Sequence, residues 1–395
     1  MTKHHDPATR AARAAIGTET QHGAVVPPLY LSANFTFAGL DGKRQYDYTR
    51  DGNPTRSALA DALAEAEGGH GAIVTASGMA AVTLVCQLLD PGDRVVAAHD
   101  CYGGTFRLFD RLQQRGLLEV EFVDLTDAES MAAAIASRPK LVLVETPSNP
   151  LLRITDLEAV CRHAKRAGAL VVADNTFMSP ALQRPIQWGA DMVVHSTTKY
   201  LNGHSDVVGG AVIAATEELH EFFHGWATTM GLAGAPFDSY LTLRGLRTLH
   251  SRLRCHEENA LAVVEMLAEH PAVTKVFHPS LPGHPGHEIA RRQQDGFGAM
   301  ASFEVAGGRE DLAVLVSNLT CLSLAESLGG VESLISHPAT MSHASMTAEA
   351  RATAGISDQL LRLSIGIERA DDLVADLRGA LDRVLNRPRS AAAAG

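Results

Sequence analysis

The sequence predicts an α/β fold in which a mostly parallel, seven-stranded sheet is covered by helices on both faces. Short apolar, β-branched runs alternate with longer helical patterns from about residue 57 onward. These runs are apolar nearly throughout, which is typical of strands buried on both faces. Strands separated by helices favour doubly wound parallel pairing. The expected strands are 72–76, 94–98, 120–124, 141–145, 170–174, 192–196 and 209–214.

The segments between these strands have the pattern of helices. One is MAAVTLVCQLL after Gly78, and another is DLEAVCRHAKRAG. The second opens on Asp156, a favourable N-cap, and ends on Gly168, which suits a helix C-terminus.

The two ends of the chain differ from this central pattern. The stretch YDYTRDGNPTR (46–56) is polar and rich in turn formers, which predicts an extended arm. After a helical stretch from about 246 to 270, strand-like runs at 299–305 and 361–366 lie among helices. We therefore expect an arm over 1–56, a sheet domain over 57–245 and a smaller α+β domain over 246–395.

Composition narrows the possible functions. The 395 residues carry a formal net charge of −11 and no basic run, so we expect no nucleic-acid partner. The N-terminus has no signal-peptide core and no stretch is apolar enough to span a membrane, so we expect a cytoplasmic protein. The five cysteines are widely separated and form no CxxC, which predicts reduced thiols rather than disulfides or zinc ligands.

A histidine-rich segment, HPSLPGHPGHE, raises the possibility of a metal site. It contains His278, His284 and His287, but its prolines and glycines predict an irregular loop, and no second cluster has ligand spacing. We expect a polar surface loop and no metal.

Candidate functional residues follow the expected strands, where doubly wound sheets place their sites. Lys199 follows the run 192–196, and a lysine in a partly enclosed site loses its proton readily and forms a Schiff base with an aldehyde. Pyridoxal phosphate is the cofactor that such a lysine suggests. It needs a phosphate cradle and an acid near its pyridine nitrogen.

The sequence offers both of these features. Backbone N–H groups at the start of a helix favour an anion, and hydroxyl groups beside Lys199 add donors. Asp174, about 25 residues before the lysine, is placed to keep the pyridine nitrogen protonated. Alone, an aspartate at a strand end is more often a cap, and a lysine is usually solvated; their joint placement favours a site. The cradle candidates are Ser77, Gly78, Met79, Ser196 and Thr198.

Long ordered motifs from about residue 11 to 385 strongly resemble the Cys/Met-metabolism family of pyridoxal-phosphate enzymes, which have fold type I. Their sequences are most similar to those of the bacterial members that form cystathionine, and almost as similar to those of the members that cleave it. The motifs are YTRDGNPTR, ASGM, HDCYGGTFRLF, VETPSNPLL, ADNTFMSPALQRP, HSTTKYLNGHSDVVGG, FDSYLTLRGLRTL, LAESLGGVESLISHPATMSHASM and GISDQLLRLSIGIE.

The resemblance implies roles for residues near the cofactor. Lys199 matches the Schiff-base lysine, and Tyr102 the residue that stacks on the cofactor ring and acts in acid–base steps. Tyr48 and Arg50 match residues that reach the phosphate from a neighbouring subunit. A homotetramer built from two active dimers is therefore expected.

The resemblance also implies a substrate site. Arg362 matches the arginine that grips the substrate α-carboxylate, helped by Ser327 and Asn149. Glu326 matches a position associated with chemistry at Cγ. Arg107 is a candidate for a distal carboxylate.

The implied reaction is γ-replacement of an O-acylhomoserine, with the O-succinyl ester as first candidate, by L-cysteine to give L-cystathionine in methionine biosynthesis. The alternatives are cleavage of cystathionine to cysteine, 2-oxobutyrate and ammonia, and use of the O-acetyl ester. Asp51 is a departure, because some relatives that use the succinyl ester carry a basic residue there. An acid facing the pocket would repel a succinate tail.

Two other classes of protein fit the sequence less well. A nucleotide-binding protein is disfavoured because no GxGxxG or GxxxxGK[ST] follows a strand. A catalytically silent scaffold is disfavoured by intact Lys199, Asp174 and Arg362.

Overall fold

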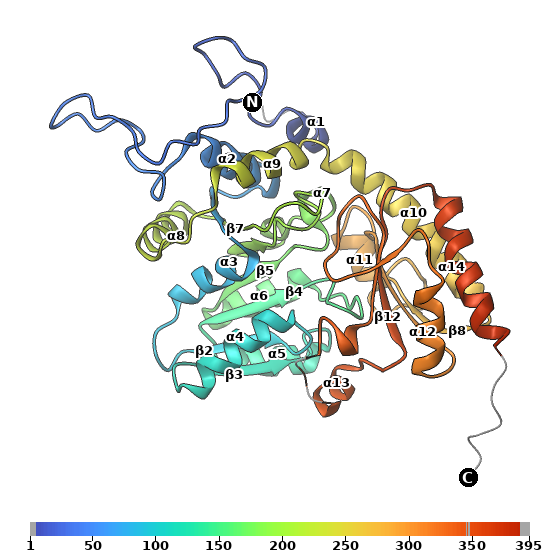
Figure 1. Cartoon of the computed structure of the whole chain (residues 1–395). Coiled ribbons are helices and arrows are strands. Elements are labelled where there is room, and N and C mark those ends of the chain that lie inside the picture. Colours follow the sequence, from blue (N-terminus) through green and yellow to red (C-terminus); the bar gives the residue numbers. More distant parts are fainter. Residues whose placement is uncertain (1–4, 345, 347, 388–395) are drawn as a thin grey trace.

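The computed structural model describes residues 5–344, 346 and 348–387. Figure 1 shows a large sheet with its helices, a second part that carries a smaller sheet, and N-terminal loops that extend away from both. We call the segment from α10 to α14 the C-terminal part. None of the helices in the described ranges is long and apolar enough to cross a membrane.

The large sheet has seven strands in the order β1-β7-β6-β5-β4-β2-β3. Strands β2 to β6 pair in parallel, whereas β7 runs antiparallel to both of its neighbours, β1 and β6. The sheet is therefore mostly parallel, and each strand lies within about a residue of its predicted range. The strands are β1 (Gly71–Thr75), β2 (Arg94–Ala98), β3 (Glu119–Val123), β4 (Leu141–Glu145), β5 (Leu170–Asp174), β6 (Met192–His195) and β7 (Gly210–Ala214).

Both faces of this sheet are buried along six of its strands, as their apolar sequences require, whereas the edge strand β3 has only exposed and half-buried residues. Along β7, Ile213 belongs to one apolar core and its neighbours Val212 and Ala214 to another. The first core includes residues of α2, α10 and the second sheet, and the other includes residues of α3 to α6 and α8. The alternation follows from the two-residue period of a strand.

The helices around the large sheet agree with the prediction. The helix after Gly78 is shorter than its apolar pattern and ends in a turn of 3₁₀ helix at Cys86–Leu88. Asp156 caps α6 through its side chain, and Gly168 ends it with φ +75°. The helices are α2 (Pro54–Glu67), α3 (Gly78–Val85), α4 (Gly103–Gln114), α5 (Ala128–Ala136), α6 (Leu157–Ala167), α7 (Ser179–Leu182), α8 (Glu217–Met230) and α9 (Pro236–Leu246).

The second sheet has the order β10-β11-β12-β9-β8. The sequence predicted its two central strands, β9 (Met300–Val305) and β12 (Leu360–Ser364), but missed β8 (Val273–Phe277), β10 (Ser323–Leu324) and β11 (Leu334–Ser336). Strand β8 is partly exposed, and the other two are too short for a recognisable period. The helices of this part are α10 (Leu249–Glu269), α11 (His287–Gln293), α12 (Arg309–Ser317), α13 (Ala348–Ala354) and α14 (Ala370–Leu385).

The predicted arm is only partly extended. Residues Pro7–Ala12 form helix α1, and Ala11 and Ala14 are buried. At the other end Asn53 caps α2, so that helix takes the last residues of the predicted arm. Between them the chain is mostly exposed loop, and its exposed apolar residues are Val25, Val26, Tyr30, Leu31, Phe37, Leu40 and Tyr48.

The histidine-rich segment forms the expected loop up to Gly286, but His287 begins helix α11, and the surface position was predicted wrongly for His278. His278 is fully buried and bonds to the Ser280 hydroxyl at 2.7 Å. Burial lowers the pKa of His278 to about 4. Leu281 of this loop packs against the apolar core, a contact that composition alone does not reveal.

Candidate active site

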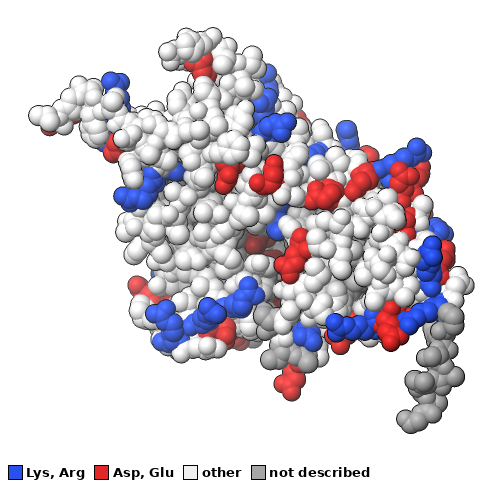
Figure 2. Space-filling model, in the orientation of Figure 1, with Lys and Arg blue, Asp and Glu red and all other residues white. Residues whose placement is uncertain are grey.

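A cavity of about 550 Å³ opens at the carboxyl edge of the large sheet, where that edge meets the C-terminal part. Figure 2 shows this face hollowed between the two parts, with charged side chains at the hollow. Parallel strands end at one edge, so residues far apart in the chain meet there. Lining residues that the sequence singled out are Ser77, Gly78, Met79, Tyr102, Arg107, Asn149, Asp174, Ser196, Thr198, Lys199, Glu326, Ser327 and Arg362.

Lys199 lies four residues beyond the end of β6, and its amine is bound by a residue of the C-terminal part. Nζ donates a hydrogen bond to Ser327 Oγ at 2.7 Å. Burial, helped by the charge of Arg362, lowers the pKa of Lys199 to about 8. Ser327 has φ +91°, a strained conformation for a non-glycine residue and one that often marks a functional site.

The residues predicted to hold a phosphate meet at the start of α3. Ser77 caps this helix by accepting from the Ala80 N–H at 3.1 Å, which leaves its hydroxyl proton to be donated. A side chain at Gly78 would place its Cβ 2.9 Å from Ser196 Cβ, so glycine is needed for this close approach. The Thr198 hydroxyl both donates to and accepts from Gly209, at 3.2 and 3.0 Å.

Two carboxylates lie side by side on the cavity floor. Asp174 ends β5 and is paired in register with Glu145, which ends β4. Burial raises the pKa of both groups, and the charge of Asp174 raises that of Glu145 further. Hydrogen bonds from Thr176 to Asp174 and from the Tyr102 N–H to Glu145 act in the opposite direction.

Glu145 was not among the residues predicted from the sequence, although its position at the end of a strand could have indicated it. It ends LVLVE at the position that Asp174 occupies in LVVAD.

A second buried pair lies behind Asp174 and was also missed. His195, the last residue of β6, has its Nε2 2.6 Å from Glu67 Oε1 at the end of α2, and both side chains are almost fully buried. Asn175, which follows Asp174, donates to the same Glu67 oxygen at 2.8 Å. The sequence held no local sign of this pair, because its members are 128 residues apart.

Arg362, on β12, brings a buried positive charge to the other wall. Nη1 donates to Asn149 Oδ1 at 2.8 Å and Nη2 donates to the Ser327 carbonyl at 3.0 Å. Its Nε has no hydrogen-bond partner among the residues that the structure describes. A planar guanidinium so oriented suits a carboxylate.

Helix α4 carries two further lining residues. Tyr102 is its N-cap residue and keeps 43% of its surface exposed. Gly104 leaves room for the Tyr102 ring, because a Cβ at residue 104 would lie 2.5 Å from it. Arg107, in the same helix, lines the cavity, as does Glu326 from the C-terminal part.

Tyr48 and Arg50 do not line the cavity of their own chain. They lie in the arm, where Arg50 Nη1 donates to the Thr228 carbonyl of α8 at 2.6 Å and the guanidinium stacks over Tyr48. Asp51 faces α8 as well, since its carboxylate accepts from the Thr228 hydroxyl at 3.1 Å.

These side chains fit pyridoxal phosphate. The cradle at the start of α3, whose close packing needs Gly78, offers N–H and hydroxyl donors to a phosphate. Asp174, half-buried at the end of β5, offers a carboxylate to a pyridinium, and Lys199 offers a readily deprotonated amine. An exposed aromatic ring at Tyr102 completes the set that this cofactor requires.

Comparisons with known proteins agree with this fit. The model of a family described as Cys/Met metabolism PLP-dependent enzyme matches residues 8–382. A cystathionine gamma-synthase of Escherichia coli (strain K12) is 55% identical over 371 residues, which cover 94% of this chain and 96% of the relative. A cystathionine gamma-lyase of Dictyostelium discoideum is 44% identical and covers 95% and 97%.

The fold is also similar to that of a solved structure. The cystathionine gamma synthase from Xanthomonas oryzae pv. oryzae, in complex with cystathionine, superposes with a TM-score of 0.95 at 60% identity, over 96% of this chain and 99% of that chain.

Proposed function

Because the chain belongs to the Cys/Met metabolism PLP-dependent enzyme family, we propose that it catalyses the reaction of a cystathionine gamma-synthase. In this reaction the thiol sulfur of L-cysteine bonds to Cγ of an O-acylhomoserine and the whole acyloxy group leaves as the carboxylate. We propose O-succinyl-L-homoserine as the donor. The products are L-cystathionine and the free acid. The observation that carries the proposal is the meeting of Lys199, Asp174 and Arg362 around one cavity of a chain so similar to these synthases.

The geometry supports specific roles for the side chains. When bound, pyridoxal phosphate supplies an electron sink for negative charge at the substrate Cα. Lys199 Nζ, whose pKa is lowered to about 8, takes the proton from Cα and then moves protons at Cβ. The guanidinium of Arg362 orients the α-carboxylate through paired hydrogen bonds. Asn149 and the Ser327 carbonyl hold this guanidinium in place.

Residues at the cavity mouth support selection of the γ-substituent. The carboxylate of Glu326 suits the second amino group of cystathionine, which the incoming cysteine supplies. The guanidinium of Arg107 suits the far carboxylate of a succinyl ester. Asp51, whose carboxylate is engaged by α8, is not turned toward this chain's own cavity.

We also propose that the active assembly is a homotetramer of two active dimers. Arg50 and Tyr48 lie outside their own cavity, and the arm that carries them exposes large apolar residues. An exposed apolar segment of this kind fits a second copy of the chain. A neighbouring subunit's arm would then bring both residues to the phosphate cradle.

The runner-up function is that of a cystathionine gamma-lyase, which adds water to cystathionine overall and releases cysteine, 2-oxobutyrate and ammonia. The similarity to the Dictyostelium lyase favours it. The test is an assay of the purified enzyme with cysteine and O-succinyl-, O-acetyl- or O-phospho-L-homoserine, beside an assay with cystathionine alone. We expect cystathionine from the succinyl ester. Efficient release of 2-oxobutyrate from cystathionine, with no cystathionine formed from any ester, would establish the lyase instead.

A further inference from the structure

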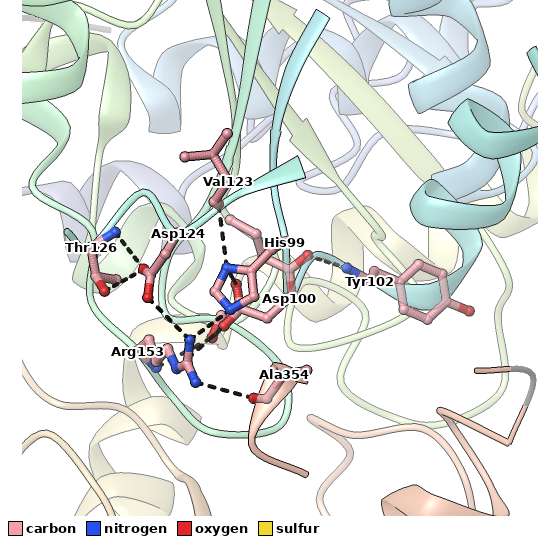
Figure 3. A network of polar contacts seen from close by, with 10 residues as sticks. His99, Asp100, Tyr102, Val123, Asp124, Thr126, Arg153 and Ala354 are labelled. Carbon is pink, nitrogen blue, oxygen red and sulfur yellow. Dashed lines mark hydrogen bonds and ion pairs between the residues drawn. The ribbon is translucent and has the colours of Figure 1, made fainter. Parts of the chain in front are cut away.

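Arg153 lies outside the cavity lining, yet it touches the loops that build the cavity. It stands in the loop after β4, four residues beyond Asn149, and its guanidinium meets three other segments of the chain (Figure 3). Nη1 lies 2.7 Å from His99 Nε2 and 3.4 Å from an Asp124 oxygen. Nη2 donates to the Ala354 carbonyl at 3.1 Å, and Nε lies 3.8 Å from Asp100.

The charge of Arg153 is needed by Asp100. This carboxylate is buried and accepts a hydrogen bond from Ser148 Oγ at 2.5 Å. A buried carboxylate is stable only when a positive charge or several donors compensate it. Among the described residues, the cations recorded within ion-pair distance of Asp100 are Arg153 and, when protonated, His99.

His99 does not supply that charge in this arrangement. A guanidinium only donates, so His99 Nε2 must accept from Arg153 and the ring proton must lie on Nδ1. Nδ1 then faces the Val123 carbonyl at 3.3 Å, and the imidazole is neutral. Arg153 is therefore the compensating charge for Asp100.

The contacts of Arg153 connect two walls of the candidate site. Asp100 stands two residues before Tyr102. Ser148, which bonds both Asp100 and the Arg153 N–H, stands one residue before Asn149, the partner of Arg362.

A third connection reaches the C-terminal part. Ala354 ends α13, and the chain continues from there into β12, which carries Arg362. One guanidinium thus joins the loop after β2, the loop after β4 and the approach to β12.

We propose that Arg153 is a positioning residue, which holds the Tyr102 ring and the Asn149–Arg362 clamp in one geometry. It touches neither substrate nor cofactor, and acts through Asp100, Ser148 and the Ala354 carbonyl. This inference rests on the proposed function, since it assigns Tyr102 and Arg362 their roles in that reaction.

The first test compares Arg153→Met with Arg153→Lys and with a matched control, Arg292→Met. Arg292 of α11 also joins the C-terminal part to the large-sheet part, through Asp156, the N-cap residue of α6, at 2.6 Å, but no contact links it to Asp100 or Ser148. With rates normalised to bound cofactor, R153M should lower kcat and raise KM, so that kcat/KM falls about 10- to 100-fold. R153K should recover part of the loss, and R292M should stay within about twofold of the parent enzyme.

A purely structural role makes a different prediction. It would lower the melting temperature of R153M but leave kcat and KM per bound cofactor equal to those of R292M, and that result would overturn the proposal. If R153M does not fold, the double variant D100N/R153M removes the uncompensated buried charge. The same comparison of kcat and KM then applies.

The second test needs no reaction. Hydrogen–deuterium exchange of the cofactor-free protein should show faster exchange in R153M for residues 99–107 and for 351–356, but not in R292M. Unchanged exchange in either segment would contradict the connection between the loops. If the unmodified enzyme forms no cystathionine, the proposed function fails, and the exchange result alone decides whether Arg153 joins these segments.

Discussion

Lys199 Nζ donates a hydrogen bond to Ser327 Oγ at 2.7 Å, so an amine in the loop after β6 of the large sheet is held by a residue of the C-terminal part. Because burial and Arg362 lower the pKa of this amine from 10.5 to about 8, its neutral form predominates only above about pH 8.

The first prediction follows from this pKa. When pyridoxal phosphate is added to the cofactor-free enzyme, its rate of attachment to Lys199 should rise with pH through about 8 and then level off. Borohydride trapping at a series of pH values, followed by peptide mass spectrometry, measures this rate. Lys199→Ala should yield no modified peptide at this position. A rate that keeps rising toward the ordinary lysine pKa of 10.5 would show that the amine is not desolvated.

The second prediction concerns Glu145. Its pKa is raised by burial and by Asp174, so between the ordinary value of 4.5 and the raised value the folded state binds more protons than the unfolded state. Stability of the cofactor-free enzyme should therefore fall as pH rises through this window. Glu145→Gln cannot ionise, so it should be more stable than the parent enzyme at neutral pH and lose that advantage below about pH 4.5. Urea unfolding at both pH values measures the difference.

Asp174→Asn is the matched comparison for that experiment, because it also removes one carboxylate of the Asp174–Glu145 pair. It should in addition lose a charge-assisted hydrogen bond to the cofactor, about 1.5–3 kcal/mol, and so bind pyridoxal phosphate roughly 10- to 100-fold more weakly. Equal cofactor affinities in the two variants would argue against Asp174 as the partner of the pyridine nitrogen.

A third prediction separates substrate binding from cofactor binding. Arg362→Lys keeps a positive charge but loses the fork that Asn149 and the Ser327 carbonyl hold. Loss of the second charge-assisted hydrogen bond should weaken substrate binding by about 1.5–3 kcal/mol, while cofactor affinity stays unchanged. Spectral titration of the loaded enzyme with substrate measures the first, and equilibrium dialysis of pyridoxal phosphate the second. An unchanged substrate affinity would remove Arg362 from the carboxylate site.

The fourth prediction tests whether arms are shared between subunits. Arg50→Ala and Lys199→Ala chains should each be inactive alone, yet active when co-expressed, because a hybrid dimer has one site with both normal residues. Random mixing of equal amounts should restore about a quarter of the sites. Sedimentation of the mixture verifies assembly. If assembled mixtures stay inactive, Arg50 serves its own chain.

The sequence predicted well those features whose cause is local. A strand buried on both faces must be apolar along its whole length, so six strands of the large sheet could be placed from short apolar runs in the sequence. The edge strand β3 was placed as well, although it is partly exposed. The same reasoning placed Asp174 at the end of one strand and Lys199 beyond the end of another, where the fold brings them to one cavity. It failed for β10 and β11, whose two or three residues form no pattern and are held by their neighbours in the sheet.

Other features depend on partners that are distant in the chain. Glu67 and His195 are separated by 128 residues, and nothing near either one indicates that they form a buried pair. From the sequence, Arg153 cannot be distinguished from other charged loop residues. Its contacts with His99, Asp100 and Ala354 appear only in the folded chain.

The sequence by itself therefore determined the strand positions of the large sheet, the burial of most of its strands on both faces and the chemical groups available at its edge. Only the tertiary structure decided that Glu145 lies against Asp174, that Lys199 is desolvated beside Ser327 and that Arg153 joins three segments. The physical reason is one of range. Apolar periodicity acts between near neighbours, whereas pKa shifts and charge compensation depend on which groups the folded chain brings within a few ångströms.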